Sequence, residues 1–174
     1  MKIKNSPQAD ADFADAYEKY ADAIFRHCAY RCFDRERAKE LMQETFIKAW
    51  DYLVSGKSID NVQAFLYKTA NNLLIDEARR AKKRTVVSFE DMVEGGFDLP
   101  GEDGRDQNRI FDAKAVAEVL HEIDEPYRTA LILRYIDDLQ PREIAELLSE
   151  SANVVSVRLN RGLKMLRNIL VNYG

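Results

Sequence analysis

The sequence predicts an all-α protein of two small helical domains, joined by a flexible acidic linker, with a helix-turn-helix in the second domain. Three observations predict this class. The 174 residues include only 7 Gly and 4 Pro, too few for a collagen-like or Pro-rich chain. Apolar residues recur at spacings of three and four, without the alternation of β-strands. The charge distribution divides the chain into three parts.

This charge distribution separates the linker from the two domains. The formal net charge is -4, but it is +3 over residues 1–84, -6 over residues 85–112 and -1 over residues 113–174. The middle segment also contains four of the seven glycines and no sustained helical period. We therefore expect a first domain at 9–84, a linker at 85–112 and a second domain at 113–174.

Three helices are predicted before the linker, over residues 9–33, 34–53 and 61–84. The first has one apolar stripe, which consists of Phe13, Tyr17, Tyr20, Ile24 and Cys28. Asp34 is suited to cap the second helix, although Arg37 stands at the third position where a capping box has an acid. Residues 54–60 contain the Gly and Ser of a surface loop.

Four more helices are predicted after the linker, over residues 109–123, 126–136, 141–148 and 152–173. Pro141 has the fixed φ that suits a first helical turn. Only three residues separate the last two helices. A short helix, a tight turn and a longer helix form a helix-turn-helix.

The last helix has a basic, amide-bearing face opposite its apolar stripe. The stripe consists of Val155, Leu159, Gly162, Leu163, Leu166, Ile169 and Leu170. The opposite face presents Asn153, Ser156, Asn160, Arg161 and Lys164, flanked by Arg158 and Arg167. In the major groove Arg reads guanine and Asn reads adenine, while Lys and Arg meet phosphates. This face indicates duplex DNA binding, and the alternative is an ordinary solvated helix face.

The third helix ends in a cluster of cations that would suit phosphates: Arg79, Arg80, Lys82, Lys83 and Arg84. Polar groups lie upstream on the same helix, near Phe65 and Tyr67; they are Asn71, Asn72 and Asp76, with Lys57 in the preceding loop. Aromatic rings beside amides and cations suit unstacked single-stranded bases. The alternative is that both rings only pack and the cations complement the helix dipole.

The second helix is too polar on its outer face to be fully buried. It could dock a protein partner through Glu40, Gln43, Glu44, Phe46 and Trp50. The alternative is a solvent face with internal ion pairs, such as Glu44 with Lys48. Spacing alone leaves both interpretations open.

No pattern in the sequence indicates catalysis. A Gly-rich phosphate loop, a Ser-centred elbow and a His-Glu metal helix are all absent, so we expect no enzyme. His27, Cys28 and Cys32 are close along one helix, with His121 far away in sequence. Because Cys28 lies on the apolar stripe, we interpret it as a buried structural thiol and predict no metal or cofactor. A redox switch through Cys28 and Cys32 is the weaker alternative.

The sequence indicates a cytoplasmic protein without membrane insertion. Residues 1–7 lack the apolar run of a signal peptide, and no stretch approaches the roughly 18 consecutive apolar residues of a membrane span. Two cysteines in one short segment fit a reducing compartment.

Four blocks of the sequence resemble bacterial RNA polymerase sigma factors of the extracytoplasmic-function type, the small form that keeps only conserved regions 2 and 4. The blocks, in the family's order, are residues 40–50, 65–80, 126–135 and 142–148. The resemblance covers nearly the whole chain except the extreme N-terminus and the linker. It implies an alternative sigma factor that directs RNA polymerase to specific promoters and assists promoter melting.

The resemblance also implies roles for individual segments. The block around Gln43, Glu44 and Phe46 would grip the coiled coil of the polymerase clamp. Residues 65–84, with the loop at 56–62, would read and melt the minus-ten element. The final helix would read the minus-thirty-five element as duplex, and the linker would cross the active-site channel toward the RNA exit path. The implied partners are RNA polymerase core, through its clamp coiled coil and flap, duplex and single-stranded promoter DNA, and an anti-sigma factor.

The helix-turn-helix departs from the family pattern at four positions. Glu150 replaces a small apolar turn residue, Asn153 replaces a glycine, and Val154 and Ser156 replace the common Thr and Lys. These changes remove polar or cationic contacts and add an acid beside the DNA face. They give weight to one rival function, a sigma-like adaptor that sequesters a regulator without initiating transcription. The second rival is a helix-turn-helix repressor with the first domain as a sensor.

Overall fold

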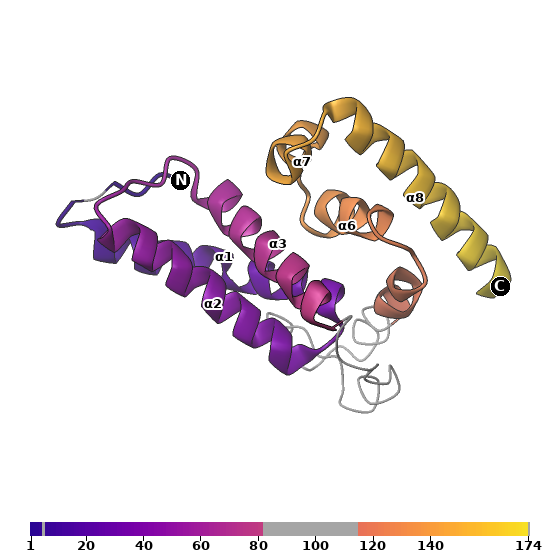
Figure 1. The fold of residues 1–174 in the computed structure, drawn as a ribbon, viewed down its shortest axis with the longest axis horizontal. Helices are drawn as coiled ribbons and strands as arrows, with labels where there is room; N and C mark the ends of the chain where they lie inside the picture. The colour runs from indigo at the N-terminus through magenta and orange to yellow at the C-terminus, as the bar shows by residue number, and fades with distance from the viewer. Residues whose placement is uncertain (5, 82–114, 174) are drawn as a thin grey trace. The chain divides into compact units, whose positions relative to one another are not determined.

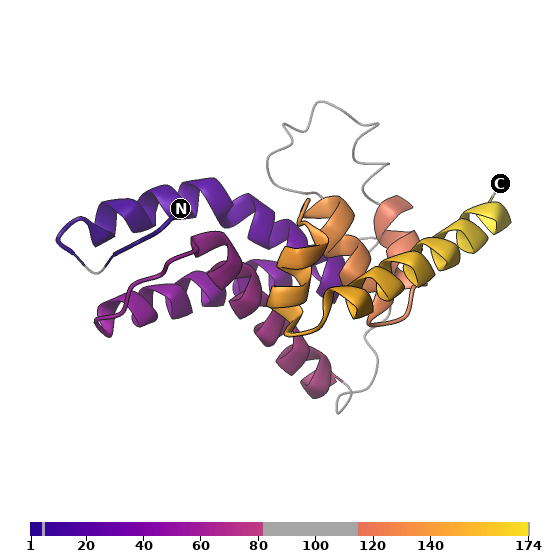
Figure 2. The same ribbon diagram turned by 90° about the horizontal axis from the view of Figure 1, so that it is seen from above.

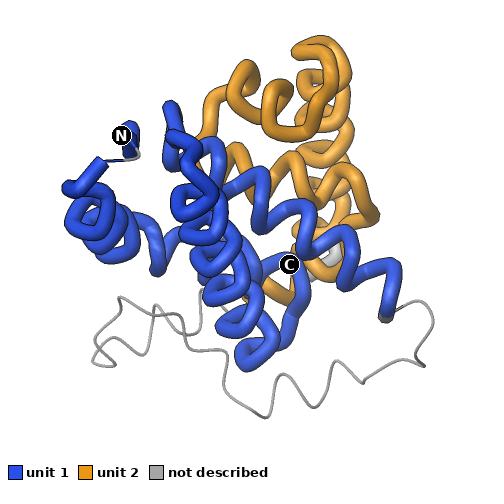
Figure 3. The backbone as a smooth tube through the Cα atoms, turned by 60° about the vertical axis from the view of Figure 1, so that its left-hand side comes forward, with its two compact units in different colours: residues 1–87 blue, residues 88–174 orange. Residues whose placement is uncertain are grey.

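The computed structural model describes residues 1–4, 6–81 and 115–173. Regular structure in these residues is helical, apart from one isolated antiparallel bridge, which confirms the all-α prediction. The chain divides into two compact units, residues 1–87 and 88–174, which Figure 3 shows in different colours. The linker predicted at 85–112 and the cations Lys82, Lys83 and Arg84 lie outside the described residues.

The described residues of unit 1 form three helices, α1 (Ala9–Cys32), α2 (Arg35–Val54) and α3 (Val62–Ala81), and each packs on the other two (Figure 1). The first two match their predicted ranges to within one residue at each end. Large buried side chains come from all three helices and include Ile24, Leu41, Phe46, Leu53 and Leu66. Burying one aliphatic side chain of this size contributes about 1.5–3 kcal/mol, so this core is the main source of the unit's stability.

The turn between α1 and α2 is built as the sequence predicts. The Arg37 backbone N–H donates to Oδ1 of Asp34 at 2.9 Å, so Asp34 is the N-cap of α2. Phe33, just before it, adopts the left-handed conformation at φ 53°. A left-handed residue followed by a cap reverses the chain within two residues, and α2 can then pack back along α1.

Residues 1–4 pair with the loop between α2 and α3, a contact that the helical periodicity does not predict. Ile3 and Ile59 form the antiparallel bridge, with N–H···O distances of 2.9 and 2.8 Å. The Val62 N–H donates to the Met1 carbonyl at 3.0 Å. Ile3 is 0% exposed and Ile59 is also buried, so this pairing belongs to the core of unit 1.

Unit 2 contains a helical segment at residues 115–121, then α6 (Tyr127–Leu131), the π-helix η1 (Ile132–Ile136), α7 (Pro141–Leu148) and α8 (Ala152–Tyr173). The sequence predicts one helix over 126–136, whereas the structure widens its last turn, where the Asp137 N–H donates to the Ile132 carbonyl at 3.0 Å. Pro141 begins α7 as predicted, and α8 is one long helix in Figures 1 and 2.

The apolar stripe of α8 follows the prediction over most of its length. Val155, Leu159 and Gly162 are buried, and the stripe is half-buried further along, but Leu170 is 52% exposed. Including Leu170 in the buried stripe was wrong. The reason is length: 22 residues extend about 33 Å, so the last turns reach beyond the short helices α6 and α7 on which α8 packs.

Gly162 is the position where α8 meets α6 most closely. A Cβ atom at this residue would lie 3.0, 3.1 and 3.3 Å from three side-chain carbons of Leu131, closer than carbon atoms normally approach. Leu131 is itself buried, so its side chain has little room to move away. Any side chain at position 162 would therefore force Leu131 to shift by a few tenths of an ångström.

Gly162→Val should destabilise unit 2 by about 2 kcal/mol, because a branched side chain would overpack the α6–α8 contact. Thermal unfolding followed by circular dichroism measures the loss. Asn160→Val is the matched control, since it places the same residue on the exposed face of the same helix. Equal melting temperatures for the two variants would contradict the proposed packing role.

Candidate nucleic-acid interface

The outer face of α3 carries four of the residues predicted to contact single-stranded DNA. Asn72, Asp76, Arg79 and Arg80 are all exposed. A salt bridge of 3.6 Å joins Arg79 to Asp76, but surface pairs of this kind contribute at most about 1 kcal/mol and do not hold the guanidinium firmly. This face can therefore present an amide, a carboxylate and two cations together.

Asn71 differs from its neighbour Asn72. It is buried, and its Oδ1 accepts a hydrogen bond from Arg31 of α1 at 3.1 Å. Asn71 thus fastens α3 to α1, while Asn72 faces outward. A helix turns about 100° per residue, which is why adjacent amides take such different roles.

Only one of the two aromatic rings expected at the predicted interface lies there. Tyr67 is only 2% exposed and lies edge-on to buried His27 at 5.3 Å, so its assignment to a base platform was wrong. Phe65 is half-buried and its ring lies 4.9 Å from that of Tyr52 on α2. The Lys57 Nζ lies 4.9 Å from the Tyr52 ring. Two aromatic rings and a cation therefore meet at the start of α3.

The residues proposed to dock a protein on α2 fall on two faces. Glu40 and Gln43 are exposed and Glu44 is half-buried, but Phe46 is 4% exposed, with ring centroids 4.8 Å from Tyr17 and 6.1 Å from Phe13. Phe46 therefore packs in the core beneath the outer face of α2 and cannot itself contact a docked protein.

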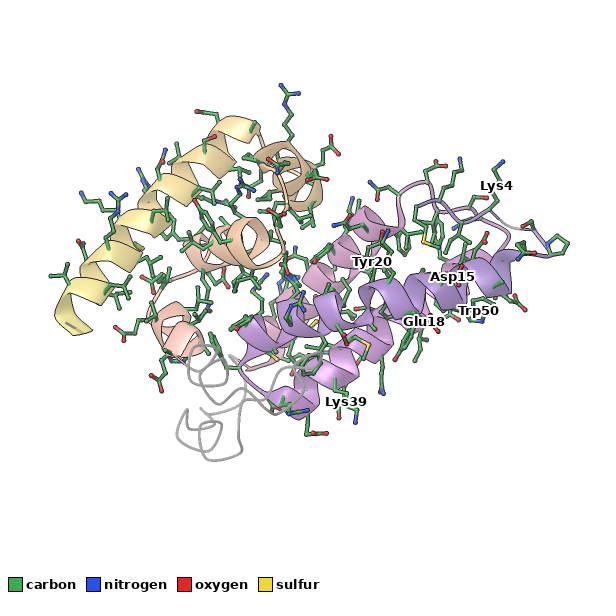
Figure 4. The ribbon with its side chains drawn as sticks, turned by 180° about the vertical axis from the view of Figure 1, so that it is seen from behind. Lys4, Asp15, Glu18, Tyr20, Lys39 and Trp50 are labelled. Atoms are coloured by element: carbon green, nitrogen blue, oxygen red, sulfur yellow. The ribbon has the colours of Figure 1, made fainter. Side chains whose placement is uncertain are left out.

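Trp50 packs against Phe13 of α1 at 5.0 Å and is half-buried (Figure 4). The apolar residue that the outer face does present is Ile47, which is 58% exposed and absent from the predicted set. Ile47 follows Glu44 by three residues and Gln43 by four, so the helical period alone places it on the same face as these two residues.

Arg37 is the centre of an ion-pair cluster that joins α2 to α3. Its guanidinium lies 2.7 Å from Glu77 of α3, and 2.7 and 3.1 Å from Glu40 and Glu44 of α2. The hydrogen bond with Glu77 is the main cause that raises the pKa of Arg37 above its ordinary value. The sequence did not indicate this cluster because Glu77 is 40 residues away.

The outer face of α8 presents the residues expected at a major-groove surface. Asn153, Ser156, Asn160, Arg161 and Lys164 are exposed. Two of them have partners in the structure: the Ser156 hydroxyl donates to the Ala152 carbonyl at 2.9 Å, and Arg161 lies 3.4 Å from the Tyr127 hydroxyl. The remaining polar groups of the face point to the surface.

Arg158, at the border of this face, is paired with Glu150 in the turn before α8. The guanidinium-to-carboxylate distance is 2.6 Å, and both side chains are largely buried. A charge-assisted hydrogen bond of this length holds the guanidinium firmly. The acid in the turn and the cation on the helix therefore neutralise each other. The sequence analysis treated the two residues separately and did not predict this pair.

The two cysteines lie on the last turns of α1, and the environment of Cys32 favours the neutral thiol. Cys28 is buried, as predicted. Burial raises the pKa of Cys32 to about 11, and its Sγ lies 3.3 Å from the Asp34 carbonyl. Because thiolate is the reactive form, this environment disfavours the redox-switch alternative.

The residues that the structure describes contain neither a metal-binding cluster nor a membrane-spanning helix. Within residues 1–4, 6–81 and 115–173, no group of three or more His, Cys, Asp and Glu side chains is placed to hold a metal ion. In the same ranges, no helix is long and apolar enough to span a membrane.

Comparisons with known proteins match both units. The family described as Sigma-70 region 2 matches residues 16–84, and the family described as Sigma-70, region 4 matches residues 113–166. The ECF RNA polymerase sigma factor SigW of Bacillus subtilis is 30% identical, over 97% of this chain and 95% of its own. SigL of Mycobacterium tuberculosis, also an ECF sigma factor, is 27% identical over 99% of this chain and 97% of its own.

Two solved structures share the fold. The sigma factor RpoE from Bartonella quintana, in complex with the anti-sigma factor NepR, has a TM-score of 0.72 at 19% identity, over 91% of this chain and 96% of its own. CnrH, in complex with the cytosolic domain of CnrY, has a TM-score of 0.66 at 19% identity, over 95% of this chain and 91% of its own.

Arg37→Ala should destabilise unit 1 by about 1–2 kcal/mol, because it removes charge-assisted hydrogen bonds between α2 and α3. Urea unfolding measures the change. Lys39→Ala, which deletes an exposed cation two residues along, is the control. If the two variants unfold at the same urea concentration, the cluster does not stabilise the α2–α3 contact.

In a Cys28→Ser variant, alkylation of Cys32 should be about 100-fold slower at pH 8 than that of a thiol with a pKa of 9, because the thiolate is correspondingly scarcer. The rate should rise about tenfold per pH unit up to pH 9.5, without levelling off. Iodoacetamide labelling followed by mass spectrometry gives the profile. A rate that already bends away from the tenfold slope between pH 8 and 9 would show an ordinary thiol, and a plateau below pH 9 would show an activated one.

Proposed function

We propose that the chain, which belongs to the sigma-70 family as a sigma factor of the extracytoplasmic-function type, divides promoter recognition between its two units. As a member of this family it is an alternative sigma factor, which directs RNA polymerase to specific promoters. Unit 1 binds the polymerase core and the minus-ten element. Unit 2 binds the minus-thirty-five element.

The observation that carries this division in unit 1 is the separation of two exposed faces on packed helices. α2 presents Glu40, Gln43 and Ile47 on one face, while α3 presents Asn72 and the two arginines at 79 and 80 on another. An acidic and apolar face suits a protein partner, for which we propose the coiled coil of the polymerase clamp. A cationic face with amides and aromatic rings suits single-stranded DNA.

Melting of the minus-ten element follows from capture of unpaired bases. Unstacking a base costs a few kcal/mol, and stacking on an aromatic ring returns about 1–3 kcal/mol per base. Phe65 and Tyr52 supply such rings at the start of α3, with Lys57 near them. The cations Arg79 and Arg80, and Lys82, Lys83 and Arg84 beyond the described residues, position the phosphate backbone.

In unit 2, α8 enters the major groove of the minus-thirty-five element. Asn153 and Asn160 are placed to reach base edges, and Arg161 and Lys164 to reach bases or phosphates. The same unit binds the flap of the polymerase. Residues 85–112, with their net charge of -6, cross the polymerase channel between the two units.

We also infer that an anti-sigma protein regulates the chain. The support is that the RpoE structure, which shares the fold, is a complex of a sigma factor with an anti-sigma factor, and that CnrH was likewise solved in complex with a partner protein. The chain has no chemistry of its own in this proposal, because the polymerase supplies catalysis.

Run-off transcription with reconstituted core polymerase tests the function. The chain plus core should give promoter-specific transcripts from a genomic library of fragments, whereas core alone should not. A chain that binds core but yields no specific transcript would be an adaptor. A chain that binds DNA but not core would be a repressor, and either outcome would overturn the proposal.

Glu150→Ala should increase the affinity of the holoenzyme for duplex minus-thirty-five DNA, because it releases Arg158 for a phosphate contact. The slope of log K against log salt should steepen by about 1. Fluorescence anisotropy at several salt concentrations measures both quantities.

Two variants control this experiment. Glu146→Ala deletes the same charge from an exposed position of α7 and should leave the slope unchanged. Glu150→Ala combined with Arg158→Ala should lose the gain. An increase of equal size in Glu146→Ala would mean that net charge, rather than release of Arg158, is responsible.

A further inference from the structure

The loop at residues 55–61, here called the capture loop, is almost entirely on the surface. Each of its residues is exposed except Ile59, which is buried. Gly56 has φ 92°, a conformation that favours glycine. Hydrogen bonds hold the two ends of the loop, from the Ser55 and Gly56 amides to carbonyls of α2 and from the Ala64 N–H to Oδ1 of Asn61, whereas Ile59 is its single buried side chain. A loop with little buried apolar surface opens at low free-energy cost.

Residues 1–4, here called the strap, contact the middle of the loop at Ile59 and the first residue of α3. The strap satisfies both backbone polar groups of Ile59, at 2.9 and 2.8 Å. It also accepts the N–H of Val62, the first residue of α3, through the Met1 carbonyl at 3.0 Å. The first amides of a helix have no partner within the helix, so the strap completes the N-terminus of α3 as well as the loop.

Side chains reinforce the backbone pairing. Ile3 is fully buried and directly paired with Ile59, while Lys2 forms a salt bridge with Asp60 of the capture loop. Alternation along an extended segment places Lys2 and Lys4 on the side opposite Ile3, where both are exposed. Figure 4 shows Lys4 at the edge of unit 1.

We propose that the strap is a positioning element for DNA: it holds the capture loop in the conformation that receives an unpaired promoter base. This inference rests on the proposed function of unit 1. If the loop were ordered only part of the time, its apparent affinity for the base would be the intrinsic affinity multiplied by the ordered fraction. Ile3 is the positioning residue, because it acts on the base only through Ile59 and the loop.

The test measures how much the holoenzyme gains from one base. The probes are a single-stranded minus-ten oligonucleotide from a promoter that the wild-type holoenzyme transcribes, and copies of it with an abasic site at each position in turn. The ratio of abasic to intact dissociation constants at the most sensitive position is the capture ratio. In Ile3→Ala this ratio should fall by about three- to tenfold, while affinity for core polymerase stays unchanged.

Three further variants make the result specific. Ile3→Val keeps a β-branched residue at the bridge and should retain the wild-type ratio. Lys4→Ala changes an exposed residue of the same strap and should also retain it. Lys2→Glu sets a second carboxylate against Asp60 and should lower the ratio in the same direction, even if Ile3→Ala does not fold. Hydrogen exchange at the Ile59 and Val62 amides reports whether the strap has opened.

The outcomes separate this inference from the function on which it rests. If the wild-type holoenzyme has no capture ratio above 1, the proposed base capture by unit 1 fails. If the wild type has a capture ratio above 1, and variants whose Ile59 and Val62 amides exchange faster keep the same ratio, only the role of the strap is overturned. Equal weakening of intact and abasic probes would also overturn it, because a merely structural role predicts that result.

Discussion

Burial of one apolar stripe per helix is the constraint on which both proposed surfaces of unit 1 depend. Each of the three helices packs on the other two, so the apolar side of each is used inside the bundle. The opposite sides of α2 and α3 are left to solvent or to partners. Because the two helices turn different sides outward, one small bundle can hold a protein on α2 and DNA on α3 without competition between them.

Internal ion pairs then decide which charges the surfaces can offer. Arg37 is held by Glu77 and by two glutamates of its own helix, so it joins α2 to α3 instead of meeting a partner. Glu150 holds Arg158 in the same way beside α8. Arg79 and Arg80 remain exposed at the end of α3. The net charge of the chain therefore says little about the charge of either DNA-binding face.

Local signals predicted the fold, and long-range contacts account for what the sequence missed. The ranges of the first two helices, the Asp34 cap and Pro141 at the start of α7 depend on neighbouring residues, and the structure confirms them. Phe65 and Tyr67 are only two residues apart on one helix, so their different burial depends on which side meets α1 and α2. Periodicity alone could not decide that. The Ile3–Ile59 bridge joins segments more than fifty residues apart and left no local signal.

The most direct test of two separate faces is side-chain footprinting of the whole chain by hydroxyl radicals, alone, with core polymerase, and with polymerase plus promoter DNA. Core polymerase should protect Ile47 on α2 and leave Phe65 and Ile75 on α3 as reactive as in the chain alone. Addition of the promoter should then protect the α3 residues. Protection of both helices by polymerase alone, or of neither, would contradict the division of unit 1 into a protein face and a DNA face.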